Sequence, residues 1–180
     1  MDTEKLTEEI TGEAVKDSSG EMAEIISIPI PGIPEMYAEQ MQPSDIPEVA
    51  GIEQECFSQP WSENSFHSAL EQEASFYLVV KTKETGRIAG YCGLLQSFDD
   101  AEILNVAVRK ELRGRGIGYA MLRCLMELGG KFGIRHYTLE VRKGNAAALA
   151  LYKKLGFDAA GIRRNFYRDP SEDAVIMWTK

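Results

Sequence analysis

The chain contains few of the residues that form disulfide frameworks or metal sites. Its three cysteines, Cys56, Cys92 and Cys124, are widely separated and include no CxxC pair, so neither a disulfide scaffold nor a zinc ribbon is indicated. Its two histidines, His67 and His136, have no metal-ligating partner at a useful spacing, and we expect no metal. Free thiols of this kind suit a reducing compartment, so we expect a cytoplasmic protein.

Long apolar runs are absent as well. No stretch approaches about 18 consecutive apolar residues, so we expect no membrane-spanning helix and no membrane partner. The chain begins with acidic residues, and its most apolar N-terminal stretch, residues 25–33, is interrupted by Pro29 and Pro31. This pattern does not predict a signal peptide.

Acidic residues outnumber basic residues by 28 to 20. The formal net charge of −8 argues against a protein that binds nucleic acid by neutralising many phosphates. The excess lies at one end, because residues 1–35 carry nine acidic residues against Lys5 and Lys16, whereas the other 145 residues carry 19 acidic and 18 basic ones. We therefore expect an acidic, flexible N-terminal extension over residues 1–35, of which residues 3–16 have a short helix as an alternative, and one domain over residues 36–180.

The first part of this domain has the hydrophobic pattern of two helices followed by paired strands. After a strand over residues 36–41, Ser44 or Asp45 is expected to cap a helix that ends near Cys56, and Ser62 to cap a second helix. The turn at residues 84–86 predicts an antiparallel hairpin. The strands expected here cover residues 75–81, 87–96 and 101–108.

The pattern changes after Val108. A glycine-rich loop leads into a helix whose apolar residues recur at three- and four-residue spacing, and a second helix, residues 145–155, is followed by Gly156 at its C-terminal end. Strands are expected over residues 136–142, 157–162 and 174–178. The order of elements predicts a mixed α/β (α+β) fold, with a mostly antiparallel central sheet flanked by helices.

The loop Arg113-Gly-Arg-Gly-Ile-Gly118 is the best candidate for a binding site. Three glycines between a strand and a helix let backbone N–H groups approach an anion at the positive end of the helix. The phosphate-loop pattern GxxxxGK[ST] is absent, and GxGxxG fails because its last position is Tyr119 or Met121. A turn that only reverses the chain remains an alternative, although Arg113 and Arg115 favour a phosphate ligand.

This loop resembles the R/Q-x-x-G-x-G/A signature of the GNAT acetyltransferase superfamily. Three further stretches, LEVR at 139–142, NAAA at 145–148 and ALYKKLGF at 150–157, are similar to one branch of it, the bacterial ribosomal-protein-alanine N-acetyltransferases. The Pro60-Trp61 turn and residues 163–167 and 172–174 also look like that branch. The similarity spans residues 36–178 and implies a GNAT fold that uses acetyl-CoA as co-substrate, without a metal.

The resemblance implies a catalytic pair. Glu140 corresponds to the general base and Tyr152 to the general acid that protonates the coenzyme thiolate, twelve residues apart as in the family. From the residues alone, Glu140 could equally face solvent from its strand, and Tyr152 could be a core residue with a satisfied hydroxyl.

The resemblance also implies a coenzyme site built mostly from backbone. The strand before the loop is expected to carry a bulge that opens it from its neighbour, so that main-chain groups bind the pantetheine while the loop binds the pyrophosphate. Asn145 has a second interpretation, as a helix cap. The implied residues are Val106, Ala107, Val108, Arg113, Gly114, Arg115, Gly116, Ile117, Gly118, Tyr119 and Asn145.

The acceptor side is implied less directly. Trp61, Arg163 with Arg164, and Tyr167 are expected to shape a pocket for an incoming protein N-terminus, with packing and solubility as the alternative roles. The resemblance implies direct attack by the N-terminal alanine of ribosomal protein eighteen of the small subunit. An α-amine, with a pKa of about 7.7–8.0, needs only a modest base. Lysine side chains or several protein N-termini are alternative acceptors, and a non-catalytic acyl-CoA-binding module is the alternative from another class. We expect a monomer.

Overall fold

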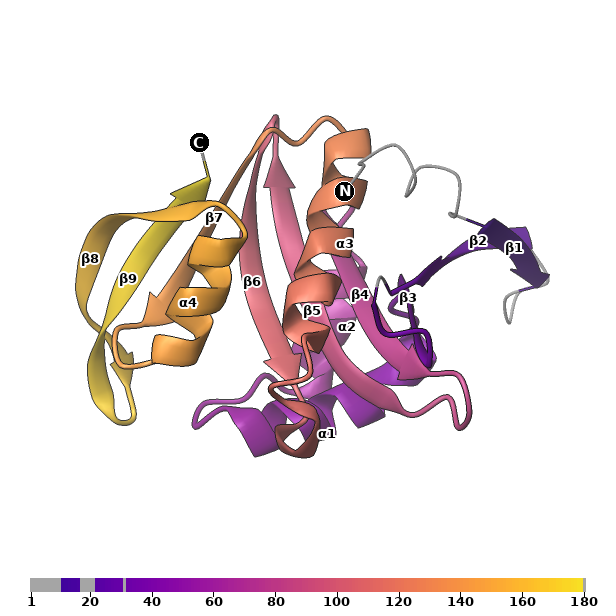
Figure 1. The fold of residues 1–180 in the computed structure, drawn as a ribbon, viewed down its shortest axis with the longest axis horizontal. Helices are drawn as coiled ribbons and strands as arrows, with labels where there is room; N and C mark the ends of the chain where they lie inside the picture. The colour runs from indigo at the N-terminus through magenta and orange to yellow at the C-terminus, as the bar shows by residue number, and fades with distance from the viewer. Residues whose placement is uncertain (1–10, 17–21, 31, 180) are drawn as a thin grey trace.

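The computed structural model describes residues 11–16, 22–30 and 32–179 (Figure 1). The helices are α1 (Ile46–Cys56), α2 (Glu63–Leu70), α3 (Ile117–Lys131) and α4 (Ala146–Lys154), with 3₁₀ turns η2 (Pro43–Asp45) and η3 (Lys110–Leu112). The strands are β1 (Thr11–Lys16), β2 (Met22–Pro29), β3 (Met36–Gln40), β4 (Ser75–Thr82), β5 (Ile88–Ser97), β6 (Asp100–Val108), β7 (His136–Arg142), β8 (Phe157–Arg168) and β9 (Ser171–Thr179). None of the described helices has the length and apolarity needed to cross a bilayer.

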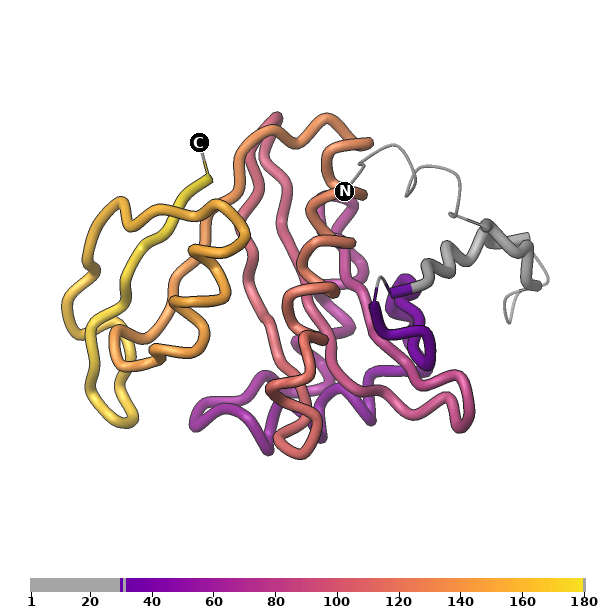
Figure 2. Tube along the Cα trace, viewed as in Figure 1, coloured from indigo at the N-terminus to yellow at the C-terminus, as the bar shows by residue number. Residues whose placement is uncertain are grey.

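The strands form one sheet in the order β1-β2-β3-β4-β5-β6-β7-β9-β8. Among the described strands, β6 and β7 form the one parallel pair. Parallel neighbours cannot be joined by a hairpin, so this pair requires the crossover through α3. The chain trace places α4 and the β8–β9 hairpin on one side of β6, and β3 to β5 on the other (Figure 2). The expected mixed, mostly antiparallel sheet is confirmed.

The helices cover the sheet on both faces, because each has one apolar side. Residues of α3 and Tyr152 of α4 share a buried cluster with Leu139 and Val141 of β7. Residues of α1 and α2 form a second buried cluster with Ala107 of β6. We call these the α3/α4 face and the α1/α2 face of the sheet.

The pairing between β6 and β7 stops half-way along the strands. Their register runs only from Asp100↔His136 to Ile103↔Leu139. At the same level, β6 has one extra residue, Leu104, opposite the Gly93–Leu94 step of β5, which is the signature of a β-bulge. Beyond the bulge, β7 stays paired with β9 up to Arg142↔Ala174. Strands β6 and β7 diverge there (Figure 1). The bulge and opening expected from the resemblance are confirmed.

Three local expectations need correction. Residues 11–16 form strand β1, so the helical alternative is wrong there, and residues 3–10 lie outside the described residues. Asp45 precedes α1 but makes no side-chain cap, since its carboxylate accepts the Gln42 N–H and pairs with Lys81 at 2.7 Å. The last two strands are longer than expected, because the mostly exposed residues of β8 lack the apolar alternation that marks a buried strand. The expected Ser62 cap is confirmed, with its side chain accepting the Ser65 N–H.

The N-terminal segment next to β3 contributes to the core. Ile30 and Ile33 are 2% and 8% exposed and belong to the buried cluster on the α3/α4 face. The boundary of the extension at residue 35 stays a prediction.

Candidate active site

The opening beside β6 exposes main-chain groups on one edge. The Arg109 N–H bonds the Ala89 carbonyl at 2.9 Å, and in an antiparallel pair such contacts alternate along the strand. The register Tyr91↔Ala107 therefore points the amide groups of Ala107 toward β5. Those of Val106 and Val108 point toward the side that β7 has left. Val106 and Val108 are thus better placed than Ala107 to bind a ligand in the opening.

The glycine loop ends where α3 begins. Gly114 has φ +77° and Gly116, the N-cap of α3, has φ +82°, a backbone region that strains any residue with a Cβ. A Cβ at either position would meet nothing within 4 Å, so the requirement for glycine is conformational rather than steric.

The first turn of α3 provides free donors. Its first intrahelical bond runs from the Ala120 N–H to the Gly116 carbonyl at 3.0 Å, so the three preceding N–H groups, of Ile117, Gly118 and Tyr119, have no acceptor within the helix. Gly116 has no side chain to cap them. An uncapped helix N-terminus of this kind suits a phosphate group better than a simple chain reversal.

The two arginines of the loop, Arg113 and Arg115, make different contacts. Arg113 folds back, with Nε donating to the Val108 carbonyl at 3.0 Å and Nη2 donating to Cys56 Sγ at 3.1 Å. It therefore fastens the loop to the end of β6 and to α1. Arg115 pairs with Glu35 at 3.3 Å, and both side chains are 52% exposed, so Arg115 is the more readily available cation.

Glu140 lies in the middle of β7, opposite Ile176 of β9. Because side chains alternate along a strand, Glu140 points away from Leu139 and Val141, toward the α1/α2 face. Its side chain is 19% exposed, and Oε1 accepts a hydrogen bond from Arg163 Nη1 at 3.0 Å. Its carbonyl accepts from the Tyr167 hydroxyl at 3.3 Å. The structure thus brings Glu140, Arg163 and Tyr167 together, and Glu140 is not an ordinary solvent-facing residue.

Tyr152 lies on the opposite face. It is 7% exposed, belongs to the α3/α4-face cluster, and packs its ring 5.9 Å from that of Phe157. Burial raises its pKa, with smaller contributions from Tyr167 and Cys92, so the hydroxyl keeps its proton at neutral pH. Helix α4 is capped by Asn145, whose Oδ1 accepts the Ala148 N–H at 3.1 Å. The capping interpretation of Asn145 is confirmed, and its contact with a coenzyme stays a prediction.

Residues 46–157 match the family model described as acetyltransferase (GNAT) family. The chain belongs to the GNAT acetyltransferase family. It is 43% identical over 139 residues to a Bacillus subtilis (strain 168) protein provisionally named ribosomal protein bS18-alanine N-acetyltransferase, covering 77% of this chain and 91% of that protein. It is 38% identical over 139 residues to ribosomal protein bS18-alanine N-acetyltransferase of Escherichia coli (strain K12), covering 76% and 92%.

Solved structures agree. The ribosomal-protein-S18-alanine N-acetyltransferase of Escherichia coli superposes with a TM-score of 0.74 at 36% identity, over 80% of this chain and 92% of that one. Ard1 from Thermoplasma volcanium superposes with a TM-score of 0.73 at 26% identity, over 80% of this chain and 96% of that one. The expected superfamily and fold are therefore confirmed, and the opening between β6 and β7 lies in a GNAT acetyltransferase domain.

Of the expected acceptor residues of this acetyltransferase, Arg163 and Tyr167 contact Glu140 beside the opening. The Trp61 ring packs 5.5 Å from that of Phe66, Arg163 stacks on Phe166 at 4.4 Å, and Arg164 is exposed. Trp61 belongs to the connection between α1 and α2, which contacts the β8–β9 hairpin where the Ser58 hydroxyl donates to the Asp169 carbonyl. The acceptor roles of Trp61, Arg163 and Tyr167 stay predictions.

Sequence reasoning assigned no role to Glu53, although it is 2% exposed. Its carboxylate accepts from the Tyr91 hydroxyl, from the Trp61 N–H at 3.1 Å and from Asn105 Nδ2 at 3.5 Å. Burial raises its pKa, and these three hydrogen bonds oppose the shift in part. The signal was available, because Glu53 follows Val49 by four positions and so shares the buried side of α1.

Proposed function

We propose that this protein is an acetyl-CoA-dependent N-terminal acetyltransferase whose acceptor is the alanine N-terminus of ribosomal protein bS18. The observation that carries the proposal is the opening between β6 and β7, which has Glu140 on the α1/α2 face and both Tyr152 and the uncapped start of α3 on the α3/α4 face. The acceptor follows from the names of relatives that this chain matches over about nine-tenths of their length. A cytoplasmic location is part of the same proposal.

The coenzyme enters from the α3/α4 face in this proposal. The N–H groups of Ile117, Gly118 and Tyr119 bind the pyrophosphate, together with the positive end of α3. Bound acetyl-CoA supplies a thioester as the activated acyl group. The free N–H groups of Val106 and Val108 lie along the opening and stabilise negative charge on the thioester oxygen, since fixed amides need no reorientation as that charge develops.

Glu140 removes the proton from the attacking amine. An α-amine has a pKa of about 7.7–8.0, so a substantial minority is already neutral near pH 7 and a carboxylate, directly or through water, suffices. A lysine amine, with a pKa near 10.4, places a much greater demand on the base. The Glu140 carboxylate pairs with Arg163, whose side chain is 58% exposed. Because this partner lies at the surface, the carboxylate can be reached from the α1/α2 face when Arg163 moves aside.

Tyr152 donates the proton that the leaving thiolate needs. Its burial raises the pKa above the ordinary value of 10.0, so the hydroxyl is protonated throughout the neutral range. A donor on the α3/α4 face reaches the sulfur from the coenzyme side while the amine attacks from the other.

Intact-mass measurement after incubation with acetyl-CoA tests the proposal. A peptide with the Ala-Arg-Tyr start implied by the family resemblance should gain one acetyl group on its α-amine. The control is the same peptide with a blocked α-amine and an internal lysine. Modification of the lysine would point to a lysine acetyltransferase, and no modification of any peptide, despite measurable binding of acetyl-CoA, would point to a non-catalytic binding module.

A further inference from the structure

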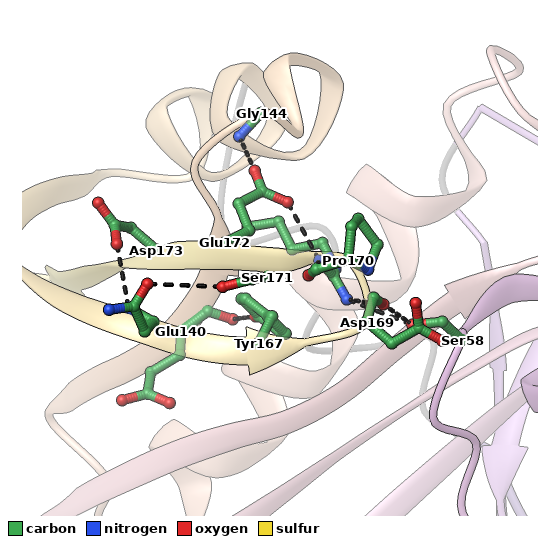
Figure 3. A network of polar contacts seen from close by, with 11 residues as sticks. Ser58, Glu140, Gly144, Tyr167, Asp169, Pro170, Ser171, Glu172 and Asp173 are labelled. Atoms are coloured by element: carbon green, nitrogen blue, oxygen red, sulfur yellow. Dashed lines mark hydrogen bonds and ion pairs between the residues drawn. The ribbon is translucent and has the colours of Figure 1, made fainter.

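Arg142 is the last residue of β7 and follows Glu140 by two positions, so the two side chains point to the same face of the sheet. The Arg142 side chain is 24% exposed. Beside it lie two segments from distant parts of the sequence. One is the connection between α1 and α2, residues 57–62, and the other is the end of the β8–β9 hairpin, residues 167–172. We call these two segments the acceptor wall (Figure 3).

The guanidinium of Arg142 binds both segments at once. Nη1 donates to the Pro170 carbonyl at 3.0 Å and to Glu172 Oε2 at 3.1 Å. Nη2 donates to the Asp169 carbonyl at 2.8 Å and to Ser58 Oγ at 3.3 Å. Four acceptors arranged around one planar group require the fork of an arginine, which the single ammonium of a lysine cannot reproduce.

The same guanidinium also fixes Tyr167. Its Cζ lies 4.2 Å from the centroid of the Tyr167 ring, within the range of a cation–π contact. The other end of Tyr167, its hydroxyl, donates to the Glu140 carbonyl at 3.3 Å. Tyr167 is therefore held between Arg142 and the backbone of the base, and a displacement of Arg142 moves the surface next to Glu140.

Glu172 links Arg142 to Gly144, two residues before the start of α4. Its Oε1 accepts the Gly144 N–H at 2.5 Å, and this bond, followed by that from Arg142, lowers its pKa. A Cβ on Gly144 would come within 2.8 Å of Glu172 Oε1, so a larger residue there would displace this carboxylate. Figure 3 shows the bond between Glu172 and Gly144. Gly144 is followed by Asn145, the N-cap of the helix that carries Tyr152.

We propose that Arg142 is a positioning residue for the acceptor: it holds the two segments of the acceptor wall together and in register with Glu140, and so fixes the path of an extended peptide toward the base. This inference rests on the proposed function, since it presumes a peptide acceptor. A peptide that contacts the acceptor wall depends on Arg142. A small amine that reaches only Glu140 does not.

Steady-state kinetics with Arg142→Lys test the role. We expect the KM for an alanine-initiated peptide of eight residues to rise about tenfold, with the KM for acetyl-CoA and the kcat/KM for alanine amide within about twofold of wild type. Arg135→Lys is the matched control, because Arg135 is exposed and directly precedes β7 at its other end, roughly 20 Å away along the strand direction. Equal losses with the peptide and with alanine amide would overturn the proposal.

Hydrogen exchange gives a readout that does not depend on activity. In Arg142→Lys, residues 57–62 and 167–172 should exchange faster together, while α1 and β4 keep their protection. Ser58→Ala removes one contact of Arg142 and the bond from Ser58 to the Asp169 carbonyl. Exchange should therefore speed more in residues 57–62 than in residues 167–172, where Arg142 keeps its bonds to Asp169, Pro170 and Glu172. Unchanged exchange in Arg142→Lys would refute the positioning role. If the wild-type protein modifies no N-terminal peptide, the proposed function fails, and the exchange comparison still decides whether Arg142 holds the acceptor wall.

Discussion

The hydrogen bonds to the buried Glu53 carboxylate, one of which comes from the Trp61 N–H, can be tested by measuring the free energy of unfolding. Two of the donors come from buried residues, since Tyr91 and Asn105 are 0% and 7% exposed. Glu53→Met keeps the length of the side chain but removes every acceptor, whereas Glu53→Gln keeps one carbonyl oxygen and offers an amide to the Tyr91 oxygen. The comparison between these two variants isolates the hydrogen bonds from the change in volume.

The expected difference follows from the two stranded donors. Each buried donor without an acceptor costs about 1–3 kcal/mol, and the thioether of methionine recovers about 1 kcal/mol of apolar burial. The free energy of unfolding of Glu53→Met should therefore lie about 1–5 kcal/mol below that of Glu53→Gln, measured by urea unfolding at pH 7. A difference below about 1 kcal/mol would refute the view that these hydrogen bonds matter to stability.

The same variants define a pH dependence. Because burial raises the pKa of Glu53 above its ordinary value of 4.5, the folded protein binds this proton more tightly than the unfolded chain does. The stabilising contribution is then fully present below pH 4.5 and is lost as the pH rises from 4.5 through the folded pKa. Wild type should gain stability relative to Glu53→Gln on acidification from pH 8, and the opposite slope would mean that the three hydrogen bonds outweigh burial.

Three further predictions concern the reaction itself. Glu140→Gln should lower kcat by about 10²–10⁴ while the Kd for acetyl-CoA, measured by calorimetry, stays within about twofold, and equal losses in both would place Glu140 outside the chemical step. Tyr152→Phe should also lower kcat. Because the pKa of Tyr152 is raised above 10.0, the pH profile of the wild-type kcat should not fall on its basic side up to pH 10. A fall near pH 8 would assign the acid to another group. Gly116→Val should weaken acetyl-CoA binding at least tenfold, since its φ of +82° is strained for valine, and unchanged affinity would contradict a phosphate role for the loop.

Most elements of the fold could be predicted because their signals are local. Strand β7 and helix α1 end where the apolar alternation and the apolar helix face end, and the positive φ of Gly114 and Gly116 fits their placement in a loop before a helix. Strand β8 was underestimated, because its exposed residues after Phe157 carry no alternation. Its extent is set instead by pairing with β9, which no local pattern records.

The candidate site was predictable only in part. The resemblance supplied Glu140 and Tyr152. The phosphate contact of Arg113 stays a prediction, and the bonds of its guanidinium to the Val108 carbonyl and Cys56 could not be read from the sequence. The contacts of Glu53 with Tyr91 and of Arg142 with Ser58 join residues 38 and 84 positions apart. Such partners depend on how the sheet brings segments together, so the roles of Glu53 and Arg142 needed the structure.

The alternation of β7 accounts for the division of the site between two faces. Leu139 and Val141 pack on the α3/α4 face with Tyr152, which leaves Glu140 and Arg142 on the α1/α2 face. Because β7 leaves β6 after Leu139 and pairs with β9 instead, this division falls at the opening rather than inside a closed sheet. In the proposed function, a coenzyme on one face and a peptide on the other bind at the same time and meet through the opening. Simultaneous binding makes an acyl-enzyme unnecessary and favours direct transfer to the amine.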